Sequence, residues 1–295
     1  MDVLSLRQHE QLFHELAQCT RSGVTLSQAF ELISHHSNDR IATRLRNVRT
    51  HLQATGNLGR AFRDAGFSES DAAVIQAGES TGRLDVVFLE LGEFYRQLAQ
   101  ARAGIIARSI YPVLVLHAGA VLLAIPPAIL KGSWWEFLAQ SVPILAGFYL
   151  GFILAVILWR LTRRQFSANA AAAAVILRVP LLGRWLSDWT TWKFASVLAL
   201  HVRAGGSLLG AFEVAAASCD NALLRKGTET AISLVQRGES LGQAFESQPG
   251  VPKPLLRAIA IGEQTGRLDE ESARAAETFK RQTLAMVDAF AQWAP

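Results

Sequence analysis

Two nearly identical octapeptides bring together the polar side chains that come closest to a chemical motif in this sequence. GESTGRLD covers residues 78–85 and GEQTGRLD covers residues 262–269. Each places carboxylates, the oxygen ligands that hard cations prefer, close to a hydroxyl and a guanidinium. The candidate residues are Gly78, Glu79, Thr81, Gly82, Arg83, Leu84 and Asp85 in the first copy, and Gly262, Glu263, Thr265, Gly266, Arg267, Leu268 and Asp269 in the second.

One interpretation of the octapeptide is a corner that joins two helices. Gly82 is placed to take the left-handed conformation that ends one helix, and Asp85 to accept the free N–H groups that open the next. Glu79 and Arg83 are four residues apart and can pair locally, which contributes a few tenths of a kcal/mol. In this interpretation the motif fixes the angle of the following helix.

The second interpretation is a functional surface. Glu79, Glu263 and the acids at 269–271 would then form part of a docking surface for a cytoplasmic partner, or a weak metal site on the two glutamates. The repetition does not distinguish the two interpretations, because a duplicated fold also duplicates its corners.

Other motifs predict neither an enzyme nor a cofactor site. His9 and His14 in HEQLFH are five residues apart, whereas the zinc-protease helix needs a spacing of four. GESTGR and GEQTGR lack the glycine and lysine spacing of a phosphate-binding loop. His35 and His36 fall in a polar stretch, SHHSND, which we expect to be a solvated connection between helices.

His117 lies inside an apolar run, where an ionisable side chain is a candidate proton or ligand site. The sequence contains no second acid or base within the apolar runs to complete a proton relay. We therefore favour a neutral histidine that is hydrogen-bonded to a neighbouring helix.

Two apolar runs, at 109–130 and 142–158, predict a membrane hairpin. At a rise of about 1.5 Å per residue the first easily spans a hydrocarbon core of about 30 Å, and the second just reaches across it. The connection at 131–141 carries Trp134 and Trp135, as expected at a headgroup boundary. The basic residues after the second run are Arg160, Arg163, Arg164, Arg178 and Arg184. The connection should therefore face outward and both flanking segments the cytoplasm. The alternative is a pair of core helices in a soluble protein.

Charge is distributed unevenly along the chain. Residues 1–104 carry 11 Lys and Arg against 12 Asp and Glu, residues 105–189 carry 7 against 2, and residues 190–295 carry 11 against 11. The net charge of +4 therefore comes from the flanks of the hairpin, which argues against nucleic-acid binding. The only two cysteines, Cys19 and Cys219, are expected to be reduced core residues.

The first 104 residues show apolar positions at helical spacing and predict a bundle of about six helices. The expected helices cover residues 6–22, 26–33, 41–52, 58–65 and 70–77, followed by a long helix from residue 84.

From about residue 189 the pattern of the first segment returns. SGVTLSQAFEL (22–32) matches AGGSLLGAFEV (204–214), and LGRAF (58–62) matches LGQAF (241–245). The offset drifts only from 182 to 184, which indicates a duplicated unit. We predict an all-α membrane protein with a first cytoplasmic bundle (1–104), a transmembrane hairpin (105–161), a juxtamembrane connector (162–188) and a second bundle (189–295).

The ordered pieces of this chain resemble the inner-membrane platform proteins of type II secretion and type IV pilus systems, the GspF/PilC family. The resemblance covers residues 5–290. It is carried by FHELAQCTRSGVTLSQAFEL, GESTGRLD, the Tyr111-Pro112 entry to the first apolar run, RVPLLGRW, KFASVLALHVRAGGSLLGAFEV and GEQTGRLD. Members of the family typically have a third, C-terminal span and an N-terminal extension, so the resemblance implies a short variant.

The resemblance implies a non-enzymatic scaffold in the bacterial inner membrane, multi-pass, with both termini cytoplasmic. Its expected partners are a hexameric cytoplasmic assembly ATPase, pilin or pseudopilin subunits, further copies of itself and membrane lipid. The alternative function is an oligomeric membrane transporter or channel subunit. An enzyme acting on a membrane lipid is a weaker third reading, because no nucleophile with an adjacent base is visible.

Overall fold

The computed structural model describes residues 4–131 and 134–293, except for some side chains between residues 108 and 155 and at 290–293. Within these ranges the secondary structure is helical and contains no strand, so the predicted all-α class is confirmed. The first seven helices are α1 (Leu6–Arg21), α2 (Leu26–His36), α3 (Asp39–Thr55), α4 (Leu58–Asp64), α5 (Glu69–Thr81), α6 (Leu84–Lys131) and α7 (Trp134–Ala168).

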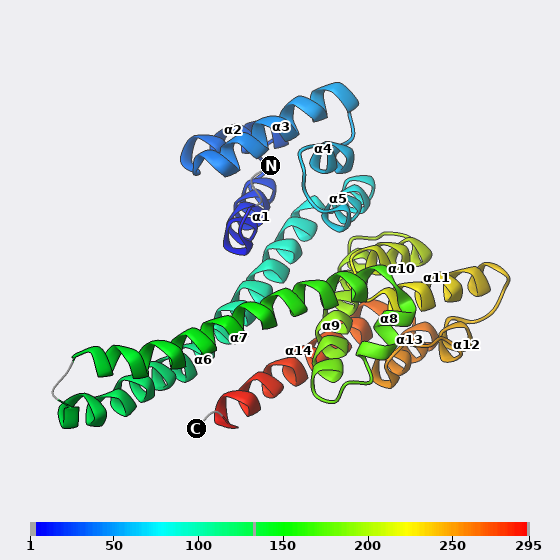
Figure 1. Ribbon diagram of the computed structural model, residues 1–295. Helices are drawn as coiled ribbons and strands as arrows, with labels where there is room; N and C mark the ends of the chain where they lie inside the picture. Colours follow the sequence, from blue (N-terminus) through cyan, green and yellow to red (C-terminus); the bar gives the residue numbers. More distant parts are fainter. Residues whose placement is uncertain (1–3, 132–133, 294–295) are drawn as a thin grey trace.

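Two helical bodies and a long arm make up the molecule (Figure 1). The first body contains α1–α5 and the start of α6, the second contains α8–α14, and α6 and α7 pack side by side to form the arm. The remaining helices are α8 (Ala170–Ile176), α9 (Leu182–Arg203), α10 (Leu208–Ala217), α11 (Ala222–Gln236), α12 (Leu241–Glu246), α13 (Lys253–Thr265) and α14 (Leu268–Trp293).

Local sequence signals fix most helix boundaries. Ser5 and Thr25 each form a capping box with a glutamine three residues later, at the starts of α1 and α2. Gly56 ends α3 in the left-handed conformation. The expected solvated connection SHHSND is shorter than predicted, because α2 continues to His36. Cationic or polar histidines suit the negative end of a helix.

The order of helices in the first body returns in the second. α1 packs along α6, and α9 packs along α14 in the same way. The helices α5 and α13 each have 13 residues and end at a glycine with φ of 68°. The duplication read from the sequence is therefore visible as a repeated order of helices.

Aromatic side chains dominate the core of the first body. Phe13, Phe62 and Phe88 are buried, with ring centroids 6.3–6.4 Å apart. In the second body Phe212 and Phe245 lie 4.9 Å apart. Buried residues of both bodies belong to one continuous hydrophobic cluster, so the two repeats are packed firmly together.

A polar cluster interrupts the core of the first body. The Tyr95 hydroxyl donates to the Asp71 carboxylate at 2.7 Å, and the ring of His9 stacks on Tyr95 at 4.5 Å. The corresponding positions of α13 and α14, 184 residues later, hold Leu255 and Phe279. The two repeats thus have the same order of helices but bury different side chains at these positions.

The tip of the arm differs from the connection expected between the two apolar runs. The expected connection 131–141 is shorter, because α7 already begins at Trp134; residues 132 and 133 lie outside the described residues. Among the residues searched, one stretch, Leu145–Ala168, is long and apolar enough to cross a membrane. The other expected span, 109–130, is helical, but many of its side chains lie outside the described set.

The predicted connector, 162–188, contains the end of α7, all of α8 and the first turns of α9. α9 begins at Leu182 and continues past residue 189, so one helix crosses the predicted start of the second bundle. The proposed division of the chain into these segments remains a prediction.

The buried Asp71 carboxylate makes stability depend on pH. Burial raises the pKa of Asp71, so its favourable contribution is present below the unfolded-state pKa and is lost as pH rises through the folded-state pKa. Asp71→Asn, which keeps an acceptor for Tyr95 without a charge, should gain stability relative to the native protein as pH rises above about 4. Asp71→Ala should lose about 1–3 kcal/mol, because the Tyr95 hydroxyl is left without an acceptor.

Denaturant unfolding in detergent across this pH range measures both effects. Burial lowers the pKa of His9 and the Asp71 charge raises it, so the pH dependence that Asp71→Asn removes belongs to this pair of side chains. A constant difference between Asp71→Asn and the native protein at every pH would contradict the assignment.

Candidate functional site: the repeated corners and the junction between the repeats

Each octapeptide turns the chain from one helix into the next at a left-handed glycine. Gly82 has φ of 68° and ψ of 20°, and the Arg83 N–H donates to the Gly78 carbonyl at 2.8 Å. Gly266 has nearly the same angles, and the Arg267 N–H donates to the Gly262 carbonyl at 3.1 Å. This hydrogen-bond pattern ends a helix without leaving its last carbonyl groups unpaired.

The glutamates of the two motifs hold the neighbouring short helices. The Glu79 carboxylate accepts the Leu58 N–H at 2.9 Å, at the start of α4. The Glu263 carboxylate accepts the N–H groups of Leu241 at 2.7 Å and Gly242 at 2.9 Å, at the start of α12. A carboxylate stabilises the positive end of a helix, so each motif clamps three consecutive helices together.

The first glycine of each motif allows close contact between helices. A Cβ on Gly78 would lie 2.5 Å from the Val87 side chain, and one on Gly262 would lie 2.8 Å from the backbone of Leu268. The glycine therefore sets how closely α5 approaches α6, and how closely α13 approaches α14.

The first corner contacts the second repeat. The Thr81 hydroxyl lies 2.7 Å from the Ala204 carbonyl, at the turn between α9 and α10, and 2.8 Å from the Ala77 carbonyl of its own helix. A Cβ on Gly205 would lie 2.7 Å from the Thr81 side chain, so the fit is close. This contact makes the first corner part of the junction between the repeats.

Arg203, at the end of α9, strengthens the junction. Its guanidinium lies 3.2 Å from the Glu90 carboxylate on α6 and 3.8 Å from the Asp269 carboxylate on α14. All three side chains are about one-third exposed. The helix that enters the arm and its counterpart in the second repeat thus share one cation.

The second corner faces solvent instead. The Thr265 hydroxyl donates to the Ile261 carbonyl at 2.8 Å, within its own helix. Ile261 is 46% exposed, and Glu263, Thr265 and Arg267 are also exposed. The first threonine therefore bonds to the other repeat, whereas the hydrogen bond of the second stays within its own helix.

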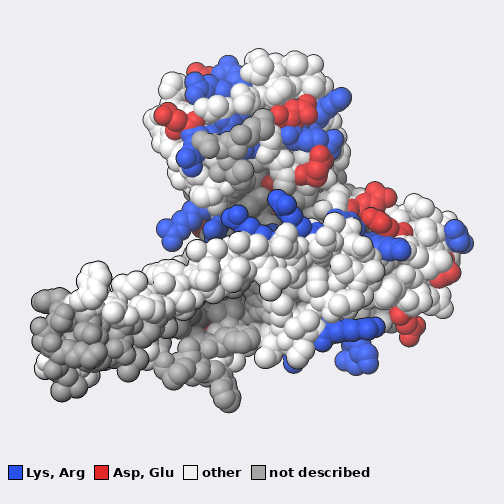
Figure 2. Space-filling view, viewed as in Figure 1, with Lys and Arg blue, Asp and Glu red and all other residues white. Residues whose placement is uncertain are grey.

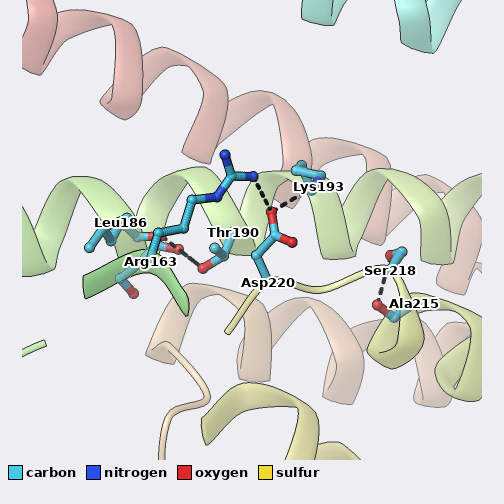
Figure 3. A network of polar contacts seen from close by, with 8 residues as sticks. Arg163, Leu186, Thr190, Lys193, Ala215, Ser218 and Asp220 are labelled. Atoms are coloured by element: carbon cyan, nitrogen blue, oxygen red, sulfur yellow. Dashed lines mark hydrogen bonds and ion pairs between the residues drawn. The ribbon is translucent and has the colours of Figure 1, made fainter. Parts of the chain in front are cut away.

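A second polar junction ties the arm to the second body (Figure 3). The Asp220 carboxylate accepts from Arg163 on α7 at 3.3 Å and from Lys193 on α9 at 3.2 Å. Burial alone would raise the pKa of Asp220, but the two cations outweigh it and lower the pKa. The carboxylate is therefore held in its charged form between the two helices.

Within the arm, His117 bonds to the neighbouring helix. Its Nδ1 lies 2.7 Å from the Val113 carbonyl and must donate to it, which leaves Nε2 of a neutral ring to accept from the Tyr149 hydroxyl at 2.9 Å. The hydrogen bond to the neighbouring helix is the one expected from the sequence.

The described residues show no cluster of three or more metal-ligating side chains. Glu79 and Glu263, the two candidate ligands, lie in different repeats and cap different helices. Cys219 is buried, which raises the pKa of its thiol to about 11, and Cys19 is partly buried. The chemistry that this arrangement supports is positioning of helices.

The sequence did not predict two sets of ion pairs between distant parts of the chain. Arg203 and Asp220 each join elements that are far apart along the chain. Arg203 belongs to the stretch KFASVLALHVRAGGSLLGAFEV, but that stretch does not indicate its partners, Glu90 and Asp269, which lie far away in sequence.

Comparison with known proteins identifies a family. Residues 12–129 and 194–295 match the family described as type II secretion system (T2SS), protein F. Type II secretion system protein F of Pseudomonas aeruginosa is 28% identical, over 96% of this chain and 75% of its own length. Type IV pilus assembly protein PilC of Thermus thermophilus is 25% identical, over 91% of this chain and 71% of its own length.

The two threonines at the ends of α5 and α13 provide a matched test of the junction. Thr81→Val should destabilise the protein by about 0.5–1.5 kcal/mol more than Thr265→Val, because only the first removes a hydrogen bond between the repeats. Hydrogen exchange at residues 204–206 should rise in Thr81→Val and stay unchanged in Thr265→Val. Equal effects of the two substitutions on stability and exchange would show that the junction does not depend on this bond.

Proposed function

Because the chain belongs to the type II secretion system protein F family, we propose that it is the inner-membrane platform of a type II secretion or type IV pilus assembly machine. The observation that carries this proposal is mechanical. Two repeated helical bodies are joined to each other and to one apolar arm by Arg203, at the end of α9, and Asp220, in the turn after α10. Such an assembly can transmit displacement as a rigid body.

The arm is proposed to cross the membrane twice, at 109–130 and 142–158. The large apolar side chains described along it are exposed, among them Leu114, Leu122, Ile129, Leu150, Leu154 and Leu158. Figure 2 shows no Lys, Arg, Asp or Glu among the described atoms at the far end of the arm on this face. Contact of these apolar side chains with water is unfavourable, whereas contact with the hydrocarbon of a bilayer is not.

Both bodies are proposed to be cytoplasmic, as bundles covering 1–104 and 189–295. Arg160, Arg163 and Arg164 follow the second span, so the positive-inside rule favours this orientation. In Figure 1 the two bodies lie at the same end of the arm that α6 and α7 form.

The second corner is the proposed contact for the assembly ATPase. Ile261 is 46% exposed, whereas Ala77, at the matching position of the first corner, is buried, and Ile261 lies close in sequence to the exposed Glu263 and Arg267. Force applied there would pass through α13 and α14 to Arg203 and on to α6. Pilin-like subunits would be moved at the arm, in a non-enzymatic mechanism with further copies of the chain and membrane lipid as partners.

Cysteine labelling in intact cells tests the proposed topology. In a chain without Cys19 and Cys219, a membrane-impermeant maleimide should label Ser133→Cys, which follows the first span. It should label Thr55→Cys and Ser247→Cys, one in each body, only after permeabilisation. Labelling of either body in intact cells would contradict the proposal, since the two bodies would then lie on opposite sides or both outside.

Site-specific photo-crosslinking tests the proposed contact. A crosslinking amino acid at Ile261 should capture the assembly ATPase, identified by mass spectrometry, while one at Leu32 should not. Leu32 is a suitable control because it is also apolar and 52% exposed but lies in the first body. Capture of the ATPase from Leu32 and not from Ile261 would place the contact on the other repeat.

A further inference from the structure

The turn between α8 and α9 exposes an unusual amount of apolar surface. Val175, Val179, Leu181 and Leu182 are 64%, 45%, 59% and 37% exposed. They fall within eight consecutive residues outside the arm, in a segment that also contains Pro180. Single exposed apolar residues are ordinary on soluble proteins, but a contiguous group marks a surface that another phase or molecule covers.

The backbone of this turn holds Leu181 in a strained conformation. Its φ of 67° and ψ of −60°, with the Leu182 N–H donating to the Pro180 carbonyl at 2.8 Å, define a γ-turn of the rare hand. Among the described residues, Leu181 alone has a positive φ without being glycine. A strained residue that also exposes its apolar side chain makes this turn a candidate functional surface.

The turn lies beside the cytoplasmic end of the arm. The Trp159 ring, on α7, is 6.0 Å from the Trp185 ring, in the first turn of α9. Trp159, Ile176, Leu177 and Trp185 pack against one small hydrophobic cluster built around Phe166. Tryptophan is favoured at the boundary between headgroups and hydrocarbon, so the turn shares the depth at which the arm would leave the bilayer.

Charge around the turn suits an anionic surface. Arg178 and Arg184 are exposed and flank the apolar residues. Asp188, the nearby acid, is set back in the cleft between the turn and residues 250–252, where burial raises the pKa of its carboxyl. The turn therefore presents exposed apolar side chains together with two exposed cations, the composition of segments that lie in a membrane interface.

We infer that residues 175–184 dip into the membrane interface as a third contact of the chain with lipid. Val179, Leu181 and Leu182 enter the acyl boundary, while Arg178 and Arg184 bind the phosphates of anionic headgroups. The inference rests on the proposed membrane position of the arm. Its consequence is that the second body is held against the bilayer directly, beside the support it receives from α7.

An environment-sensitive fluorophore on single cysteines tests this contact. The full chain without Cys19 and Cys219 is reconstituted into vesicles of zwitterionic and anionic lipid and labelled at Leu181→Cys. Val179→Cys serves as a second position, in case the strained turn does not tolerate the first. Leu154→Cys in the arm and Leu32→Cys in the first body are the matched controls, because both leucines are similarly exposed.

The labels at 181, 179 and 154 should shift to the blue and be quenched several-fold more by nitroxide lipids than the label at 32. Arg178→Gln with Arg184→Gln should reduce quenching at 181 when anionic lipid is present. If 154 is quenched while 179 and 181 behave like 32, the inference is wrong and the membrane arm stands. If 154 also behaves like 32, the proposed function itself loses its membrane arm.

Discussion

The continuity of α6 is the constraint on which the rest of this structure depends. This helix has 48 residues, from the buried core of the first body to the tip of the arm, a length of about 72 Å. The helix continues through Pro112, Pro126 and Pro127, each of which lacks an N–H to donate, and over this length a small change of angle at its start becomes a large displacement at its far end. The corner at residues 78–85 therefore governs the direction of the arm, which explains why it is held by a glycine contact, a left-handed turn and a glutamate cap together.

The second repeat restrains the same helix from the side. Arg203 links α9 to α6 and α14, and Asp220, in the turn after α10, links α9 to α7. Individually, such partly exposed ion pairs contribute little to stability. Their value here is geometric, since they connect both helices of the arm to one element, α9, and leave the two bodies few independent directions in which to move.

Much of this architecture could be predicted from the sequence because its signals are local. The helix starts at Leu26 and Leu84 follow from capping residues and glycines, and the repeat follows from the recurrence of LGRAF and GESTGRLD. The capping role of Glu79 could not be predicted, because its partner, Leu58, is brought near by the packing of α4 on α5. The same holds for Arg203 and for the turn at Leu181, whose conformation no propensity favours. The expected hairpin connection was too long because Trp134 to Ser141, read as a boundary segment, has nothing that prevents a helix.

The unequal use of the two corners has a consequence for how the repeats can diverge. In the first repeat, a change at Thr81 or Gly82 alters the fit to Ala204 and Gly205, so folding itself limits which residues are acceptable. In the second, the Thr265 hydroxyl bonds within its own helix, and Glu263 and Arg267 beside it are exposed. Duplication has therefore produced two copies of the motif in one chain. The contact with the second repeat constrains the first copy, whereas the second copy can change to fit a binding partner.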